Sequence, residues 1–196
     1  MKEYNIVMCG VGGQGTVLAS KIIAQTAIRN NMNARVGETH GMSQRGGTVI
    51  SHVRIGSEVY GALIPEAQGD CMLAFEPVES LRYMNYVKKD AFVIVNEHPI
   101  VPTSVNAGLA TYPRFEEVKK ELQRVTNNIV SVDASRIASD AGGIISLNMV
   151  ILGMFSQIPN CPFPQEELKK SIEELVKPKF IQLNLNAFDQ GVKVNH

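Results

Sequence analysis

Residues 4–29, with the sequence YNIVMCGVGGQGTVLASKIIAQTAIR, pass from an apolar segment through a glycine-rich turn into an amphipathic segment. Residues 4–9 are mostly apolar, which predicts a short buried strand. Residues 16–29 repeat apolar side chains near one face at helical spacing, which predicts a helix. These side chains are Leu18, Ile22, Ile23 and Ala27. A strand, a glycine turn and a helix in this order are typical of a layered α/β domain.

The rest of the chain continues the alternation of strands and helices. Strands are expected at residues 33–36, 48–55, 71–75, 91–96 and 129–132. Helices are expected at residues 77–87, 115–125, 134–140, 144–157 and 165–176. The turn signal at Gly56 and Ser57 predicts that residues 58–64 return as a second strand of an antiparallel hairpin.

The fold class follows from this order of elements. We expect one α/β domain over residues 1–196, with a layered Rossmann-like architecture and a mostly parallel or mixed central sheet. The hairpin is inserted in that sheet. Residues 158–196 form its C-terminal helical part, which packs as a cap.

Composition narrows the classes of protein. The 196 residues carry 19 basic and 19 acidic side chains, so the basic surplus of a nucleic-acid-binding protein is missing. Three scattered cysteines without a CxxC pair argue against an iron–sulfur or structural zinc site in this chain. The N-terminus lacks a signal-peptide pattern and no apolar stretch is long enough to span a bilayer. We expect a soluble cytoplasmic protein that binds neither nucleic acid nor membrane.

The glycine turn GVGGQG at residues 10–15 contains the spacing GxGxxG between the expected strand and helix. In that context the spacing is typical of dinucleotide binding, because glycines let the backbone approach a pyrophosphate at a helix N-terminus. Glu38 follows at about the distance at which a Rossmann domain places its ribose-binding acid. The glycines of the turn are Gly10, Gly12, Gly13 and Gly15.

Two other interpretations of the turn stay open. Its N–H groups could form a nest that holds an anion or a partner's carboxylate, or the glycines could serve only to pack the helix tightly on the sheet. A P-loop is excluded, because Thr16 and Val17 stand where that motif needs lysine followed by serine or threonine.

A second glycine-rich stretch, GETHGMSQRGG at residues 37–47, has no periodicity and is expected to be a long loop. Arg45 is its candidate for binding a carboxylate or phosphate through both guanidinium nitrogens, or else for satisfying loop carbonyls. His40 either orients a substrate or partner group or orders the loop through a backbone hydrogen bond. The remaining candidates form a local polar network or permit unusual backbone angles: Glu38, Ser43, Gln44 and Gly46.

Two blocks taken together carry a family resemblance: CGVGGQGTVLASKIIAQTA at residues 9–27 and GETHGMSQRGGTVISHVRIG at residues 37–56. In this order and spacing they resemble the gamma-type domain of the pyruvate and 2-oxoacid:ferredoxin oxidoreductases. The sequence of the second block is similar to the corresponding sequence in beta subunits of the indolepyruvate branch of this family. Residues 63–82 and 93–102 also fit, so the resemblance runs through most of the chain and is thinner after residue 102.

The resemblance implies a subunit of a heteromeric oxidoreductase of amino-acid catabolism, inactive alone and without catalytic residues of its own. Thiamine diphosphate and the [4Fe–4S] clusters would sit in a large partner subunit, with coenzyme A as co-substrate and ferredoxin reached through the complex. Both glycine-bearing segments would face the partner or its active site. The alternative is a free-standing Rossmann-type dinucleotide-binding protein or dehydrogenase, for which the chain beyond residue 96 offers little room for a substrate region.

Overall fold

The structure is built on a six-stranded sheet of mixed strand direction. The computed structural model describes residues 1–40 and 46–194, with His40 described by its backbone alone. The strands are β1 (Tyr4–Val11), β2 (Asn33–His40), β3 (Thr48–Gly56), β4 (Gly69–Ala74), β5 (Val87–Asn96) and β6 (Ile129–Val132). They lie in the order β2-β3-β1-β4-β5-β6. The pairs β1–β4, β4–β5 and β5–β6 are parallel, whereas β3 is antiparallel to both β1 and β2.

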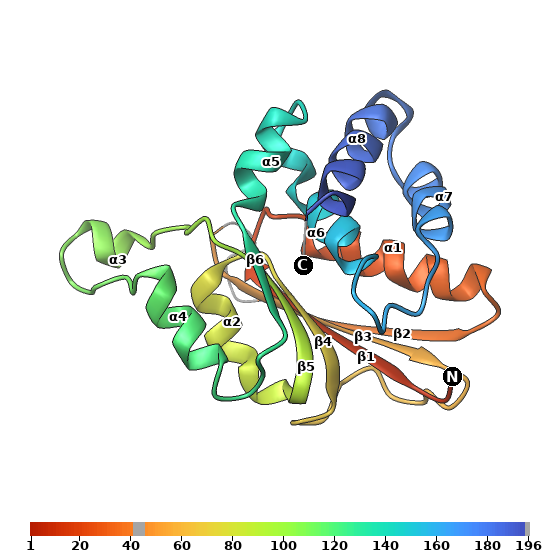
Figure 1. Ribbon diagram of the computed structural model, residues 1–196, viewed down its shortest axis with the longest axis horizontal. Helices are drawn as coiled ribbons and strands as arrows, with labels where there is room; N and C mark the ends of the chain where they lie inside the picture. The colour runs from red at the N-terminus through yellow and green to blue at the C-terminus, as the bar shows by residue number, and fades with distance from the viewer. Residues whose placement is uncertain (41–45, 195–196) are drawn as a thin grey trace.

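Helices cover both faces of this sheet, as Figure 1 shows. One face carries α1 (Thr16–Arg29), α6 (Leu147–Phe155), α7 (Gln165–Leu175) and α8 (Ile181–Val192). The other face carries α2 (Pro77–Tyr83) and α4 (Phe115–Leu122). The remaining helical segments are α3 (Thr103–Asn106), α5 (Ala134–Asp140) and the short 3-10 turns η1 (Met84–Tyr86), η2 (Ile144–Ser146) and η3 (Pro178–Phe180).

The two faces arise from the alternation of side chains along each strand. In β1, Ile6 and Met8 belong to the core under α1 and α6. Val7 and Cys9 point the other way and join the cluster that includes residues of α4. All eight residues of β1 are buried, as expected for a strand covered on both faces.

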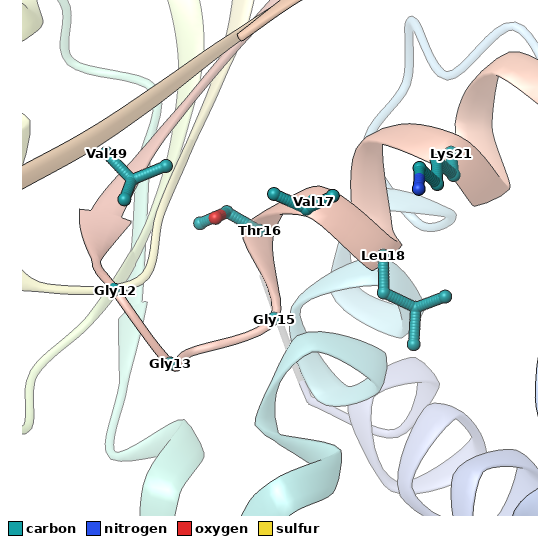
Figure 2. A pocket seen from close by; sticks show the side chains of 8 residues that line it. All are labelled: Gly12, Gly13, Gly15, Thr16, Val17, Leu18, Lys21 and Val49. Atoms are coloured by element: carbon teal, nitrogen blue, oxygen red, sulfur yellow. The ribbon is translucent and has the colours of Figure 1, made fainter. Parts of the chain in front are cut away.

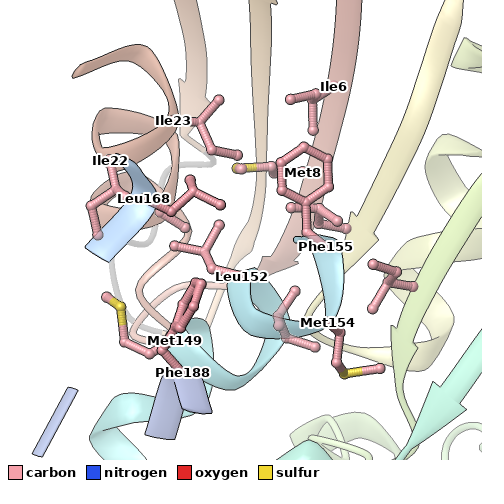
Figure 3. Packing of buried hydrophobic residues seen from close by; sticks show 14 of the residues in the cluster. Ile6, Met8, Ile22, Ile23, Met149, Leu152, Met154, Phe155, Leu168 and Phe188 are labelled. Carbon is pink, nitrogen blue, oxygen red and sulfur yellow. The ribbon is translucent and has the colours of Figure 1, made fainter. Parts of the chain in front are cut away.

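The larger core is centred on α6, all nine residues of which are buried. Figure 3 shows Leu152 and Phe155 of this helix among side chains from β1, α1, α7 and α8. Burying an isoleucine or phenylalanine fully contributes roughly 1.5–3 kcal/mol, so this layer is a main source of stability. At the crossing of α6 and α8, a Cβ atom on Gly153 would lie 2.1 Å from the Phe188 carbonyl oxygen. Only glycine lets the two helices approach this closely.

The predicted layered α/β fold with a mixed central sheet is confirmed, and α1 has the expected bounds. The prediction that residues 58–64 form a hairpin with β3 is wrong. Strand β3 pairs with β2 and β1, so neither of its edges is left for residues 58–64, which form no strand. In that segment Val59 and Ile64 are nevertheless buried, and Ile64 packs in the same cluster as Val7 and Cys9 of β1.

The hairpin instead joins β2 to β3 through the second glycine-rich stretch. Residues 37–40, predicted as loop, pair with residues 49–52. The first four residues of the expected loop therefore belong to β2, which continues to His40. The C-terminal helical cap contains two helices, α7 and α8, and α6 lies between the sheet and the cap.

Candidate functional site

A sharp glycine turn joins β1 to α1 at the carboxyl end of β1. Gly13 and Gly15 have positive φ angles, of 108° and 80°. A Cβ atom on Gly15 would also lie 2.7 Å from Nδ2 of Asn148, so both backbone conformation and space require glycine there. No side chain of the described residues caps the start of α1. The first N–H groups of the helix have no intrahelical acceptor, so they can donate to a group outside the helix.

Gln14 closes the gap between β1 and β4 behind the turn. Its Oε1 accepts a hydrogen bond of 2.7 Å from the Val11 N–H, and its Nε2 donates one of 2.7 Å to the Phe75 carbonyl oxygen. Helices leave β1 and β4 toward opposite faces of the sheet, and open α/β sheets place ligands in the crevice at such a point. The Gln14 side chain occupies part of that crevice.

The two glycine-bearing segments lie side by side. Gly12 N donates to Gly47 O at 2.8 Å, and Gly46 N donates to Gly12 O at 3.4 Å. Gly46 has a positive φ of 79°, the special backbone angle expected for it. The second segment thus ends against the first, because β3 pairs with β1 and Thr48 lies opposite Val11.

A cavity of about 470 Å³ opens beside the glycine turn. Figure 2 shows Gly12, Gly13 and Gly15 along its base, with Thr16 and Val17 at the start of α1 and Val49 on the neighbouring strand. Lys21 lies one turn farther along α1 and supplies a positive charge at the rim. Backbone N–H groups, a helix N-terminus and a lysine together favour an anionic group in this cavity.

Glu38 does not lie where a dinucleotide-binding domain would need it. Strand β3 stands between β1 and β2, so Glu38 is two strands away from the turn. Its Oε1 accepts a hydrogen bond of 3.0 Å from the Ser20 hydroxyl of α1. The carboxylate therefore helps fasten β2 to α1, and the position of a ribose-binding acid beside β1 is taken by β3.

The chain matches a known protein family over almost its whole length. A model of the pyruvate ferredoxin/flavodoxin oxidoreductase family matches residues 5–194. The chain belongs to this family. The resemblance found in the sequence blocks is thereby confirmed.

Relatives and a solved structure place the chain within the family. It is 48% identical over 98% of its length to the indolepyruvate oxidoreductase subunit IorB of Thermococcus kodakarensis, covering 96% of that protein. It is 47% identical, with the same coverage, to the subunit of the same name from Pyrococcus horikoshii. The crystal structure of pyruvate oxidoreductase subunit PORC from Thermotoga maritima matches with a TM-score of 0.71 and 25% identity, over 97% of this chain and 96% of that one. The indolepyruvate branch predicted from residues 37–47 is the branch of the first two relatives.

Three of the predicted site residues lie outside the described residues: Ser43, Gln44 and Arg45. His40 ends β2, where its backbone pairs with Val49, close in register to the glycine-bearing segments. Gly10 has no room for a side chain, because a Cβ atom there would lie 2.9 Å from the Cβ atom of Phe75. Gly10 is thus needed for packing the turn.

The cysteines are arranged unlike the ligands of an iron–sulfur cluster. Cys9 and Cys71 are fully buried in clusters on opposite faces of the sheet, and burial raises the pKa of both thiols. Cys161 is a free, partly buried thiol. Within residues 1–40 and 46–194, no group of three or more potential ligands is placed to hold a metal ion. In that same part of the chain, no helix has the length and hydropathy to cross a membrane.

Sequence reasoning missed two side chains that shape the turn. Gln14 lies inside the glycine motif, but its inward direction becomes visible only in the fold. Asn148, 1% exposed, donates from Nδ2 to the Gly15 carbonyl oxygen at 3.2 Å. The sequence indicates Asn148 only as a single polar residue near the start of the apolar segment LNMVILGMF.

Proposed function

We propose that this chain is the small, cofactor-free subunit of a cytoplasmic, heteromeric 2-oxoacid:ferredoxin oxidoreductase, folded as a single gamma-type domain over residues 1–196. The substrate is indolepyruvate or a related aryl pyruvate. The large partner subunit carries thiamine diphosphate and the [4Fe–4S] clusters, and the complex transfers the acyl group to coenzyme A while reducing ferredoxin. The observation that carries the proposal is the near-full-length identity of 48% to a subunit named for indolepyruvate.

The site residues have a supporting role in this proposal. The glycine turn and the residues joined to it, Gly46 and Gly47, form an edge rich in backbone N–H groups. That edge faces the large subunit, near bound coenzyme A or the 2-oxoacid. Thiamine diphosphate supplies the carbanion stabilisation that decarboxylation requires. This chain supplies polar backbone groups and the positive end of α1, with His40 and Arg45 as the proposed side-chain donors.

The alternative of a free-standing dinucleotide-binding protein finds less support. The side chain of Gln14 fills part of the crevice between β1 and β4. Strand β3 separates Glu38 from the turn. Both features oppose the way in which a Rossmann domain holds a dinucleotide.

The decisive experiment is reconstitution. The chain is co-expressed with the thiamine-dependent large subunit from the same genome, and reduction of ferredoxin or a viologen dye is measured with indolepyruvate and coenzyme A. We expect activity from the complex and none from this chain alone. Phenylpyruvate, pyruvate and 2-oxoglutarate serve as comparison substrates for the choice of branch.

Two results would count against the proposal. Full activity of the large subunit alone would show that this chain is not part of the catalytic machinery. Tight binding of a nicotinamide dinucleotide by this chain alone, measured by calorimetry, would favour the alternative.

A further inference from the structure

Residues 98–113 form an arm that projects from the body of the protein between β5 and α4. Figure 1 shows this segment, with α3 at its tip, reaching away from the sheet beside α2 and α4. Helix α3 buries none of its residues. Between residues 98 and 111 every residue except Val105 is exposed. The arm therefore contributes little to the core that holds the domain together.

The composition of the arm differs from that of an ordinary solvated loop. Its sequence, HPIVPTSVNAGLATYP, contains no aspartate, glutamate, lysine or arginine, although such residues make up 19% of the chain. Three of its apolar side chains are exposed: Ile100 by 38%, Val101 by 40% and Leu109 by 82%. Depletion of charged residues marks the core of protein–protein interfaces, and clustered exposed apolar groups mark surfaces that bind other molecules.

One buried carboxylate holds both ends of the arm, where they join the body of the protein. Glu76, 2% exposed, accepts hydrogen bonds from the Ile100 N–H at 3.2 Å and from the Tyr112 hydroxyl. It also accepts from the Glu79 N–H at 3.0 Å, which caps α2. Burial and the neighbouring Glu76 carboxylate raise the pKa of Tyr112, so its hydroxyl stays a donor. An anchored arm loses less conformational freedom on binding than a free one.

A cavity of about 640 Å³ lies between the arm and α2. The arm contributes Ile100, Val101 and Val105 to its lining, and α2 contributes Val78, Glu79 and Arg82. Val11, Gly46 and Thr48 line it as well. Since Gly46 is hydrogen-bonded to the glycine turn, this cavity is continuous with the edge of the protein that carries that turn.

We propose that the arm is a docking surface for the large subunit, and that the cavity between the arm and α2 receives a segment of that subunit that carries both apolar and polar groups. This inference rests on the proposed function. The large subunit is favoured over a second copy of this chain because it is the molecule that we propose faces the glycine turn. The cavity and the arm adjoin that turn, so the same subunit also covers them.

The test compares two substitutions of highly exposed apolar residues, Leu109→Asp on the arm and Tyr60→Asp. Tyr60 is 86% exposed and follows β3 at the opposite end of β1 from the glycine turn, since Tyr4 pairs with Ile55. We expect both variants to melt as the wild type does when isolated. In calorimetric titrations with the purified large subunit, Leu109→Asp should raise Kd roughly ten- to hundredfold, in the range of interface hot spots. Tyr60→Asp should bind as the wild type does.

The other outcomes separate failure of this inference from failure of the proposed function. If the wild-type chain forms no active complex with the large subunit, the proposed function fails and the docking surface with it. If the wild-type complex is active but Leu109→Asp binds normally, or both variants weaken binding equally, the docking surface alone is wrong. It is also wrong if sedimentation shows that the isolated chain dimerises through Leu109 while the variant still binds the large subunit normally.

Discussion

The side-chain amide of Gln14 donates a hydrogen bond of 2.7 Å to the carbonyl oxygen of Phe75, which ties the glycine turn after β1 to the end of β4. The same side chain accepts from the Val11 N–H. A residue of the glycine motif thus acts within the chain, as a bridge between the two central parallel strands.

Replacing Gln14 by alanine removes both hydrogen bonds. Because the Val11 N–H then has no acceptor, we expect the free energy of unfolding to fall by about 1–3 kcal/mol, measured by chemical denaturation. The matched control is Gln182→Ala, which removes an amide that bonds Asn186 on the exposed side of α8. The control should stay within about 0.5 kcal/mol of the wild type. Equal losses in the two variants would contradict the bridging role of Gln14.

A second prediction concerns the crossing of α6 and α8. A Cβ atom on Gly153 or on Gly191 would lie 2.1 Å from a carbonyl oxygen of the other helix, so either substitution by alanine forces the helices apart. Each should lower the free energy of unfolding by about 3 kcal/mol, the upper part of the usual range for overpacking. The double variant should lose less than the sum, because the first substitution has already separated the helices.

The control for this pair is Gly61→Ala, since a Cβ atom there meets only Arg54 Nη1 at an ordinary 3.5 Å. Denaturation curves of all four variants give the comparison. A strictly additive double variant would mean that the two glycines do not share one close contact.

The contrast between α1 and the hairpin shows what the sequence could predict. Helix α1 has the predicted bounds because its glycine turn and its apolar spacing are local signals. The partner of β3 is a non-local property: residues 58–64 follow a turn signal, yet β1 and β2 already pair with both edges of β3. A local pattern does not show which segment occupies the edge of a strand.

The meeting of the two glycine-bearing segments also depends on a non-local pairing. Gly12 and Gly47 are joined because β3 lies beside β1 and pairs Thr48 with Val11, whereas β2 is separated from β1. The bond from Asn148 to Gly15 joins positions 133 residues apart, so no local pattern could have predicted it. The anchoring of the arm by Glu76 likewise depends on contacts 24 and 36 residues apart, whereas its cap of α2 is a local contact.

A third prediction concerns His52, which is 3% exposed and accepts a hydrogen bond from the Ile64 N–H at Nδ1. Burial lowers the pKa of its imidazole below the ordinary value of 6.5. The folded chain keeps His52 neutral while the unfolded chain protonates it. The stability that this difference contributes is present above about pH 6.5 and is lost as the pH falls below it.

Urea denaturation from about pH 8 to about pH 5, the range in which histidines titrate, measures this loss. His52→Gln keeps an acceptor for the Ile64 N–H but cannot titrate, so it should reduce the fall in stability toward acid. His98→Gln changes a histidine whose side chain is 52% exposed and serves as the control. An unchanged acid profile in His52→Gln would rule out His52 as the source.

The last prediction concerns Arg45, the residue before Gly46 in the second glycine-bearing segment. Gly46 N donates to Gly12 O, so the neighbour of Arg45 is joined to the glycine turn that we propose faces the large subunit. Arg45→Ala should leave the melting of the isolated chain unchanged. In the reconstituted complex it should lower kcat/KM roughly ten- to hundredfold, because loss of a charged hydrogen bond costs roughly 1.5–3 kcal/mol.

The control is Arg35→Ala, which removes an exposed arginine nearer the start of β2 and should affect neither measurement. The pair of measurements assigns Arg45 its role. A collapse of melting in Arg45→Ala would make the residue structural, through bonds to loop carbonyls. Unchanged activity with unchanged melting would remove this segment from the functional interface. Only intact folding combined with a damaged complex agrees with an arginine whose guanidinium binds an anionic group outside this chain.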